Sequence, residues 1–152
     1  MVLAFPCNQF GGQAGGTDAE IDGFACDEFQ LPDDFRLMRT VKVKGADASA
    51  VFKFLVAAWT GRPRSSIADK VGQAVLGASI KWNFTKFLLN ADGVPVERYG
   101  PMTSPKKIRK DAERLLTLAA AGGAGAAAAA AATPVTPTAL AAPEGLGGVE
   151  CG

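Results

Sequence analysis

The first thirteen residues place the strongest constraint on how this chain can fold. The apolar run Val2-Leu3-Ala4-Phe5 stops at Pro6, and residues 7–13 then combine amide side chains with the pair Gly11-Gly12. A short apolar run bounded by turn residues is typical of a buried strand, and paired glycines let the backbone turn freely. We therefore predict a fully buried strand over residues 2–5 that delivers Gln13 to the edge of a sheet.

Two helices are predicted in the next part of the chain. Thr17 and Glu20 form a Thr-x-x-Glu capping box, which places Cys26 on a short helix. Asp47 is the predicted cap of a second helix. Its apolar residues recur at helical spacing and indicate a core-facing stripe, to which we assign Phe52, Leu55, Val56 and Trp59.

Strands and a third helix follow. Alternating side chains predict a strand over residues 35–43, and residues 79–90 and 94–99 read as two strands joined by the turn Asn90-Ala91-Asp92-Gly93. No element is assigned to residues 61–77. Ser104 and Pro105 begin the third helix. Its predicted buried face consists of Ile108, Ala112, Leu115 and Leu116.

The C-terminal part of the chain has a different composition. Beyond about residue 119 it contains mostly alanine, glycine, threonine and proline, with almost no charge. Such a segment buries too little apolar surface to offset the entropy of ordering it. We therefore predict one domain over residues 1–118 and a disordered tail over residues 119–152, which makes Cys151 incidental.

Charge and composition exclude several classes of function. Sixteen basic and fifteen acidic residues leave a net charge of +1, which argues against a nucleic-acid partner. The chain has no histidine, so Ser-His and Cys-His pairs and most catalytic zinc sites are excluded. We expect no cofactor and no metal, because the spacings of the three cysteines match no zinc pattern.

The same features bear on compartment. Three cysteines are few and odd in number, unlike the even set that forms the disulfide framework of a small secreted domain. We therefore expect an intracellular reducing compartment, in the cytoplasm or an organelle. No apolar segment approaches the roughly 18 residues of a spanning helix. No targeting signal precedes Val2, and we expect that any such segment belongs to a missing N-terminal part.

Three stretches resemble signature segments of the glutathione peroxidase family. They are Phe5-Pro6-Cys7-Asn8-Gln9-Phe10-Gly11 with the further Gln13, then Lys81-Trp82-Asn83-Phe84, then Tyr99-Gly100-Pro101. The resemblance covers roughly residues 2–116. It implies an α/β, thioredoxin-like fold and the reduction of hydrogen peroxide and organic or lipid hydroperoxides in the oxidative stress response, with thioredoxin or glutathione as reductant.

The resemblance also assigns candidate residues. Gln13, Trp82 and Asn83 match three catalytic residues that surround the family's nucleophile, where amide and indole groups are neutral donors that stabilise a thiolate and the leaving oxyanion. Cys26 matches the resolving cysteine of the thioredoxin-dependent branch, and Cys7 is a signature cysteine for which we expect a packing role. Taken singly, Gln13 could be an ordinary turn residue, Trp82 a core residue and Cys26 a buried thiol.

The family's redox-active cysteine or selenocysteine, on a strand-to-helix turn upstream, has no counterpart here. We therefore expect an incomplete fold that lacks the central nucleophile-bearing strand and the helix after it. Unpaired buried backbone groups cost about 1–3 kcal/mol each, against about 5–15 kcal/mol for a whole domain. We expect the chain alone to be marginally folded, monomeric and inactive. It is either part of a thiol peroxidase or a non-catalytic pseudoenzyme that binds a redox partner.

Overall fold

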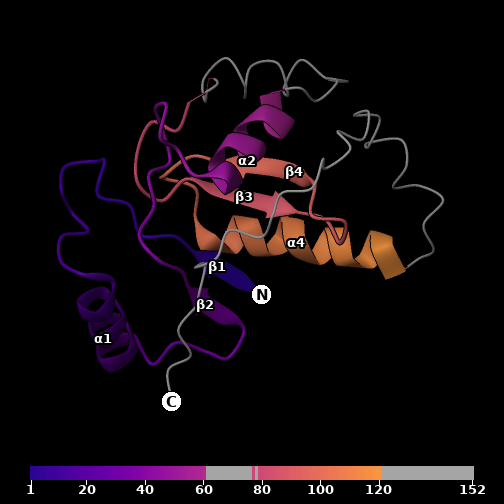
Figure 1. Cartoon of the computed structure of the whole chain (residues 1–152). Coiled ribbons are helices and arrows are strands. Elements are labelled where there is room, and N and C mark those ends of the chain that lie inside the picture. The colour runs from indigo at the N-terminus through magenta and orange to yellow at the C-terminus, as the bar shows by residue number, and fades with distance from the viewer. Residues whose placement is uncertain (61–76, 78, 121–152) are drawn as a thin grey trace. The chain divides into compact units, whose positions relative to one another are not determined.

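The computed structural model describes residues 1–60, 77 and 79–120 of the 152-residue chain (Figure 1). These residues form two compact units, one over Met1–Ser49 and one that begins at Ala50, and each is described by itself. Each unit contains a two-stranded sheet. No helix within the described ranges is both long and apolar enough to cross a membrane. The elements, in chain order, are β1 (Val2–Ala4), α1 (Asp18–Phe29), β2 (Phe35–Leu37), α2 (Ala50–Thr60), β3 (Lys86–Leu89), β4 (Pro95–Tyr99) and α4 (Pro105–Ala120).

In the first unit, β1 and β2 pair in parallel, with Val2 opposite Phe35 and Ala4 opposite Leu37. Parallel neighbours need a long crossover, and α1 lies within this connection. The predicted capping box is confirmed: the Glu20 amide donates to the Thr17 hydroxyl, and the Thr17 amide donates to the Glu20 carboxylate at 2.7 Å. The buried side chains of this unit are Cys7, Phe10, Val43 and Ala48.

The prediction of a fully buried strand over residues 2–5 is wrong in two respects. The strand ends at Ala4, and the side chains of Val2 and Leu3 are about half exposed. Within the described residues, β1 has a strand neighbour on one side only, so much of its apolar surface stays open to solvent.

The strand predicted over residues 35–43 is also too long, because β2 ends at Leu37. The next residues still follow the first strand: the Met38 amide donates to the Ala4 carbonyl at 2.8 Å, and the Val41 amide donates to the Pro6 carbonyl at 3.0 Å. These two donors are three residues apart, whereas a regular strand donates to one neighbour at every second residue. Since Pro6 has no N–H, it gives no bond in return and the ladder stops.

In the second unit, α2 packs against β4. The predicted stripe of α2 is confirmed, with Leu55 buried and Phe52, Val56 and Trp59 half-buried. The prediction that Asp47 caps this helix is wrong. The helix begins at Ala50, and the Asp47 carboxylate instead accepts a hydrogen bond from the Lys42 ammonium at 2.9 Å. Since the helix begins at Ala50, its N-cap position belongs to Ser49, two residues beyond Asp47.

β3 and β4 form an antiparallel hairpin in which Lys86 lies opposite Tyr99. The predicted turn is confirmed: the Gly93 amide donates to the Asn90 carbonyl at 3.0 Å, and Gly93 has a φ of 77°. The Asn90 side-chain oxygen accepts from the amides of Asp92 and Val94 at 3.1 and 2.9 Å. An asparagine and a glycine therefore close this hairpin by the usual turn chemistry.

The strand predicted over residues 79–90 begins only at Lys86. Phe84 has a φ of 57°, which lies in the left-handed region and is incompatible with an extended strand. The Thr85 hydroxyl donates to the Trp82 carbonyl at 3.0 Å and closes a turn there. Trp82 and Asn83 therefore lie in a loop ahead of β3, not on a strand.

α4 begins at Pro105 after Ser104, as predicted, and ends at Ala120. Its half-buried residues are Ile108, Asp111, Ala112 and Leu115, and Leu116 is exposed, contrary to the prediction. Leu116 lies about 100° around the helix from Leu115, beyond the covered face. Asp111 completes that face because its carboxylate accepts a hydrogen bond from the Tyr99 hydroxyl at 2.9 Å. The disordered tail predicted from residue 119 is wrong for residues 119 and 120, which belong to α4. The rest of the predicted tail, including Cys151, lies outside the described residues.

Candidate functional site

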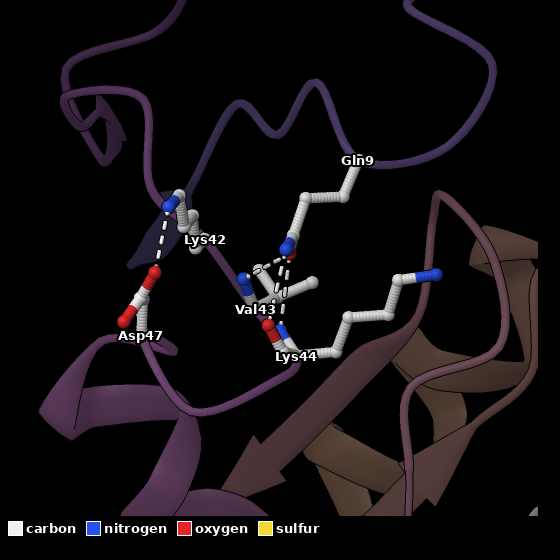
Figure 2. A network of polar contacts seen from close by, with 5 residues as sticks. All are labelled: Gln9, Lys42, Val43, Lys44 and Asp47. Carbon is white, nitrogen blue, oxygen red and sulfur yellow. Dashed lines mark hydrogen bonds and ion pairs between the residues drawn. The ribbon is translucent and has the colours of Figure 1, made fainter.

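The turn that carries Gln13 is anchored by the side chain of Gln9, which is half-buried in the first unit (Figure 2). The Gln9 Oε1 accepts hydrogen bonds from the amides of Val43 at 2.7 Å and Lys44 at 3.1 Å. Its Nε2 donates to the Lys44 carbonyl at 3.0 Å. One side-chain amide therefore makes three hydrogen bonds with the backbone of a segment more than thirty residues away in the sequence.

The same turn is closed by a second side chain. The Asn8 Oδ1 accepts a hydrogen bond from the Ala14 amide at 3.1 Å, so residues 8–14 form a loop with joined ends. Gly11 and Gly12 have φ values of 71° and 63°, a conformation that side chains other than glycine rarely adopt. Gln13 lies between this glycine pair and the closing residue, with its side chain exposed. The loop thus presents an amide donor at the surface of the first unit.

The two cysteines of the described residues have different surroundings. Cys7 is buried, in agreement with the packing role expected for it, and its Sγ lies 3.7 Å from the Gln9 Oε1. Cys26 is half-buried in the last turn of α1 and is disulfide-bonded. The helix ends just beyond it, where the Gln30 amide donates to the Cys26 carbonyl at 3.3 Å and Gln30 has a φ of 44°. Helix ends open more readily than helix centres, so Cys26 lies in the part of α1 that unwinds most easily.

In the second unit, Trp82 and Asn83 lie side by side in the loop before β3. The Trp82 side chain is 50% exposed, and Asn83 is half-buried. The positive φ of Phe84 and the bond from Thr85 to the Trp82 carbonyl give this loop its turn. The indole N–H of Trp82 and the side-chain amide of Asn83 are both neutral donors.

The backbone just ahead of this loop is held by Arg98 on β4. Its guanidinium donates to the carbonyls of Gly77 and Ser79, each at 2.9 Å. The Arg98 side chain is 3% exposed, and it lies over the Phe87 ring at 5.4 Å. Burial lowers the pKa of Arg98, because desolvation disfavours the charged form.

The segment after β4 is also held in place. The Lys86 ammonium donates to the carbonyls of Pro101 and Thr103 at 3.0 and 3.4 Å. The Tyr99 hydroxyl donates to Asp111, and the pKa of Tyr99 is raised, first by burial and then by this hydrogen bond and the negative charge of the acceptor. The bond between Tyr99 and Asp111 joins β4 to α4, and the bonds of Lys86 hold the segment between these two elements.

The predicted residues are thus divided between the two units. Gln13 and Cys26 belong to the first, and Trp82 and Asn83 belong to the second. Within the ranges that the structure describes, no three or more cysteine, aspartate or glutamate side chains gather as metal ligands would.

Sequence reasoning missed both backbone anchors, Gln9 and Arg98. Pro6 is the sequence feature that could have indicated the role of Gln9. Because Pro6 has no N–H, the ladder of backbone hydrogen bonds ends there, and the amides beyond it need another acceptor. The signal for Arg98 is weaker, because an arginine on a strand more often points to solvent.

Comparisons with known proteins follow the same segments. The sequence model of the family described as "Glutathione peroxidase" matches residues 1–56. A sunflower (Helianthus annuus) protein named "Probable phospholipid hydroperoxide glutathione peroxidase" is 44% identical over 118 residues, which is 78% of this chain and 57% of that protein. This chain belongs to the glutathione peroxidase family.

Two further members of the family match a similar share of this chain. The Arabidopsis thaliana "Probable phospholipid hydroperoxide glutathione peroxidase 6, mitochondrial" is 42% identical over 119 residues, 78% of this chain and 45% of that protein. The crystal structure of T. cruzi GPX1 matches with a TM-score of 0.50 and 35% identity, over 77% of this chain and 60% of that one. The thioredoxin-like α/β fold is therefore confirmed. The chain spans between 45% and 60% of the length of these proteins.

Proposed function

We propose that this chain supplies the donor side chains and the resolving thiol of a peroxidase that reduces hydroperoxides with a thiol reductant. The observation that carries the proposal is the closed loop of residues 8–14, which holds Gln13 at the surface in a family match that begins at residue 1. The names of the sunflower and Arabidopsis relatives support a hydroperoxide substrate. Cys7 is buried, so the attacking thiol or selenol comes from outside the described residues.

The proposed chemistry balances in three steps. The attacking thiolate cleaves the O–O bond of the hydroperoxide, becomes a sulfenic acid, and releases an alcohol once the leaving oxygen has taken a proton. Once the thiol reductant has opened the disulfide that Cys26 forms in this structure, the Cys26 thiolate attacks the sulfenic sulfur, so that a new disulfide forms and water leaves. A dithiol such as thioredoxin, or two glutathione molecules, reduces this disulfide and is itself oxidised.

The roles of the donors follow from their chemistry. The Gln13 and Asn83 amides and the Trp82 indole N–H are neutral donors, which stabilise a thiolate and the departing oxyanion without taking up a proton. Cys26 favours thioredoxin as the reductant, because a disulfide between two protein thiols is the substrate of a dithiol protein. Disulfide formation brings two Cα atoms to within roughly 7 Å, so the last turn of α1 must open for this step.

A chimera tests this proposal. The part of the sunflower relative that precedes the matched region is fused ahead of Met1, and turnover of hydrogen peroxide is measured with thioredoxin and then with glutathione. We expect turnover by the chimera and none by the 152-residue chain. Trp82→Phe and Gln13→Ala should each lower the turnover of the chimera by about tenfold or more.

Trp59→Phe is the matched control, because Trp59 lies on the core-facing stripe of α2 and should leave the rate unchanged. Cys26→Ser should abolish turnover with thioredoxin while the first oxidation of the attacking thiol persists. The proposal is wrong if Trp82→Phe and Gln13→Ala leave the rate of the chimera at its original value.

The second candidate function is that of a pseudoenzyme that binds a redox partner. The observation that favours it is the exposed pair Phe24 and Phe29 on α1, whose rings meet edge to face at 5.7 Å. Glu20 and Glu28 lie four residues to either side of Phe24, so the pair suits a partner with an apolar surface and a basic rim. Thioredoxin binding by the 152-residue chain that Phe24→Ala abolishes, together with an inactive chimera, would favour this candidate over the first.

A further inference from the structure

We propose that Gln9 is a positioning residue that fixes the loop carrying Gln13 to the backbone beyond β2. The inference rests on the proposed function of Gln13, because it assigns Gln9 the task of holding that donor in place. Gln9 acts through the loop and touches no reacting atom.

Gln9 bonds the backbone beyond β2 as a neighbouring strand would. The ladder between β1 and β2 stops because Pro6 has no N–H, and the amides of Val43 and Lys44 are left without a backbone acceptor on that side. The Gln9 side chain supplies what a neighbouring strand would supply, an acceptor for these two amides and a donor for the Lys44 carbonyl (Figure 2). The Val43 side chain is 6% exposed, so its amide lies where water does not readily take over.

The bonds of Gln9 are connected to Gln13 through the loop of residues 8–14. Phe10, the residue after Gln9, is 3% exposed, and the Lys44 ammonium lies 4.3 Å from its ring centre. Lys44 thus contacts both Gln9 and Phe10, near the start of the loop. The bond from the Ala14 amide to the Asn8 side chain ties the end of the loop to its beginning. Gln13 therefore has an anchored residue close to it on either side, and only the pair Gly11-Gly12 lies between it and Phe10.

The other polar contact in Figure 2 is the ion pair between Lys42 and Asp47, at 2.9 Å. Both side chains are exposed, and exposed pairs of this kind contribute little to a fixed geometry. The three bonds of Gln9 to the backbone of Val43 and Lys44 are therefore the stronger support for the loop.

The test uses the full 152-residue chain, labelled with nitrogen-15 for NMR. Gln9→Ala and Gln9→Asn, whose amide is one methylene shorter, should speed hydrogen exchange at the amides of Val43 and Lys44 by about tenfold or more. In the same variants, the side-chain NH₂ signals of Gln13 should shift and lose order. Gln9→Glu keeps the oxygen that accepts both amides but loses the donor to the Lys44 carbonyl, so exchange at Val43 should be slower than in Gln9→Ala and the Gln13 signals should keep more of their order.

Asn90→Ala is the matched control. Asn90 also accepts two backbone amides with its side-chain oxygen, but in the hairpin of the second unit. It should leave the signals of Val43, Lys44 and Gln13 unchanged. A thermal melt of each variant separates loss of the anchor from loss of the fold, and Gln9→Glu keeps the test valid if Gln9→Ala does not fold.

Two outcomes would overturn the proposal. The first is rapid exchange at Val43 and Lys44 in the original chain, which would mean that the anchor does not form. The second is a Gln13 side chain whose signals are unchanged in Gln9→Ala although Val43 and Lys44 exchange rapidly. These readouts do not depend on turnover, so an inactive chimera would reject the proposed function and leave the anchor to be judged separately. In an active chimera, Gln9→Ala should lower kcat by about tenfold.

Discussion

Each unit of this molecule fixes a loop that carries predicted donors by means of one side chain bonded to backbone groups, but the two side chains differ in charge. In the first unit, the neutral Gln9 bonds Val43 and Lys44. In the second, the cationic Arg98 bonds the carbonyls of Gly77 and Ser79, a few residues ahead of Trp82. The same structural task is therefore performed by an amide in one unit and by a guanidinium in the other.

The difference follows from what each backbone segment offers. The segment beyond β2 presents both amides and a carbonyl, and a side-chain amide is the group that both accepts and donates. The segment before Trp82 presents two carbonyls, which a guanidinium bonds with separate N–H groups. The charge makes those bonds stronger than neutral ones, but its burial costs solvation, as the lowered pKa of Arg98 shows.

The largest effect is expected when the charged anchor is removed. Arg98→Met keeps most of the side-chain volume but leaves two carbonyls without their donors and removes the contact with Phe87. We expect the free energy of unfolding of the second unit to fall by about 2–3 kcal/mol. Both tryptophans, Trp59 and Trp82, lie in this unit, so urea unfolding followed by tryptophan fluorescence reports on it alone.

Arg109→Met is the control for this change. Arg109 is exposed and pairs with Glu113 on α4 at 2.8 Å, so its removal should cost less than about 0.5 kcal/mol. Equal losses from both variants would show that the buried position of Arg98 does not matter.

Removal of the neutral anchor should have a smaller effect. Gln9→Ala leaves the buried Val43 amide without its acceptor, and Lys44 loses bonds that water largely replaces because Lys44 is exposed. We expect a loss of about 1–2 kcal/mol in the first unit and none in the second. Hydrogen exchange at Val43 measures the first unit, which contains no tryptophan. A change in the fluorescence transition of the second unit would contradict this separation.

Alkaline pH should distinguish the units further. The pKa of Tyr99 is raised in the folded state, so its contribution to stability is fully present below about pH 10, its unfolded pKa, and is lost as pH rises toward the folded value. The second unit should therefore weaken above about pH 10. Tyr99 is the only tyrosine of the chain, so the first unit lacks this effect.

Tyr99→Phe removes the titrating hydroxyl and should flatten the alkaline decline of the second unit, measured by urea unfolding between pH 8 and roughly 11. An unchanged decline in Tyr99→Phe would assign the effect to the lysine side chains instead.

The smallest effect is expected at the ion pair shown beside Gln9. Lys42→Met removes an exposed contact with Asp47, and we expect a change below about 0.5 kcal/mol in the first unit. The comparison with Gln9→Ala is direct, because Lys42 precedes Val43, whose amide donates to the Gln9 side chain (Figure 2). A loss as large as that of Gln9→Ala would mean that charge, and not the side-chain amide, holds this region.

Local sequence signals predicted those elements whose causes are local. The capping box of Thr17 and Glu20, the hairpin turn at Asn90 and Gly93, and the start of α4 at Pro105 each depend on residues within a few positions of one another. The sequence therefore contains the whole reason for them.

The lengths of the strands were not predictable in the same way. β2 ends early because Pro6, about thirty residues before it, cannot complete the ladder, and β3 begins late because Phe84 has a positive φ. Alternation of apolar residues reports which face of a strand is covered and says nothing of where its pairing stops. The roles of Gln9 and Arg98 were not predicted for the same reason, because the backbone groups that they bond are distant in the sequence.

The half-exposed apolar side chains of β1 have a consequence for the association of one molecule with another. In the described part of the chain, β1 pairs with β2 only, and its other edge presents backbone groups beside Val2 and Leu3. An open edge of this kind is a template for a strand from a second molecule. Because that added strand would also cover the apolar side chains of Val2 and Leu3, association through this edge depends on protein concentration, and dilution favours the monomer. The three-residue length of β1 limits how strongly any single copy can be held there.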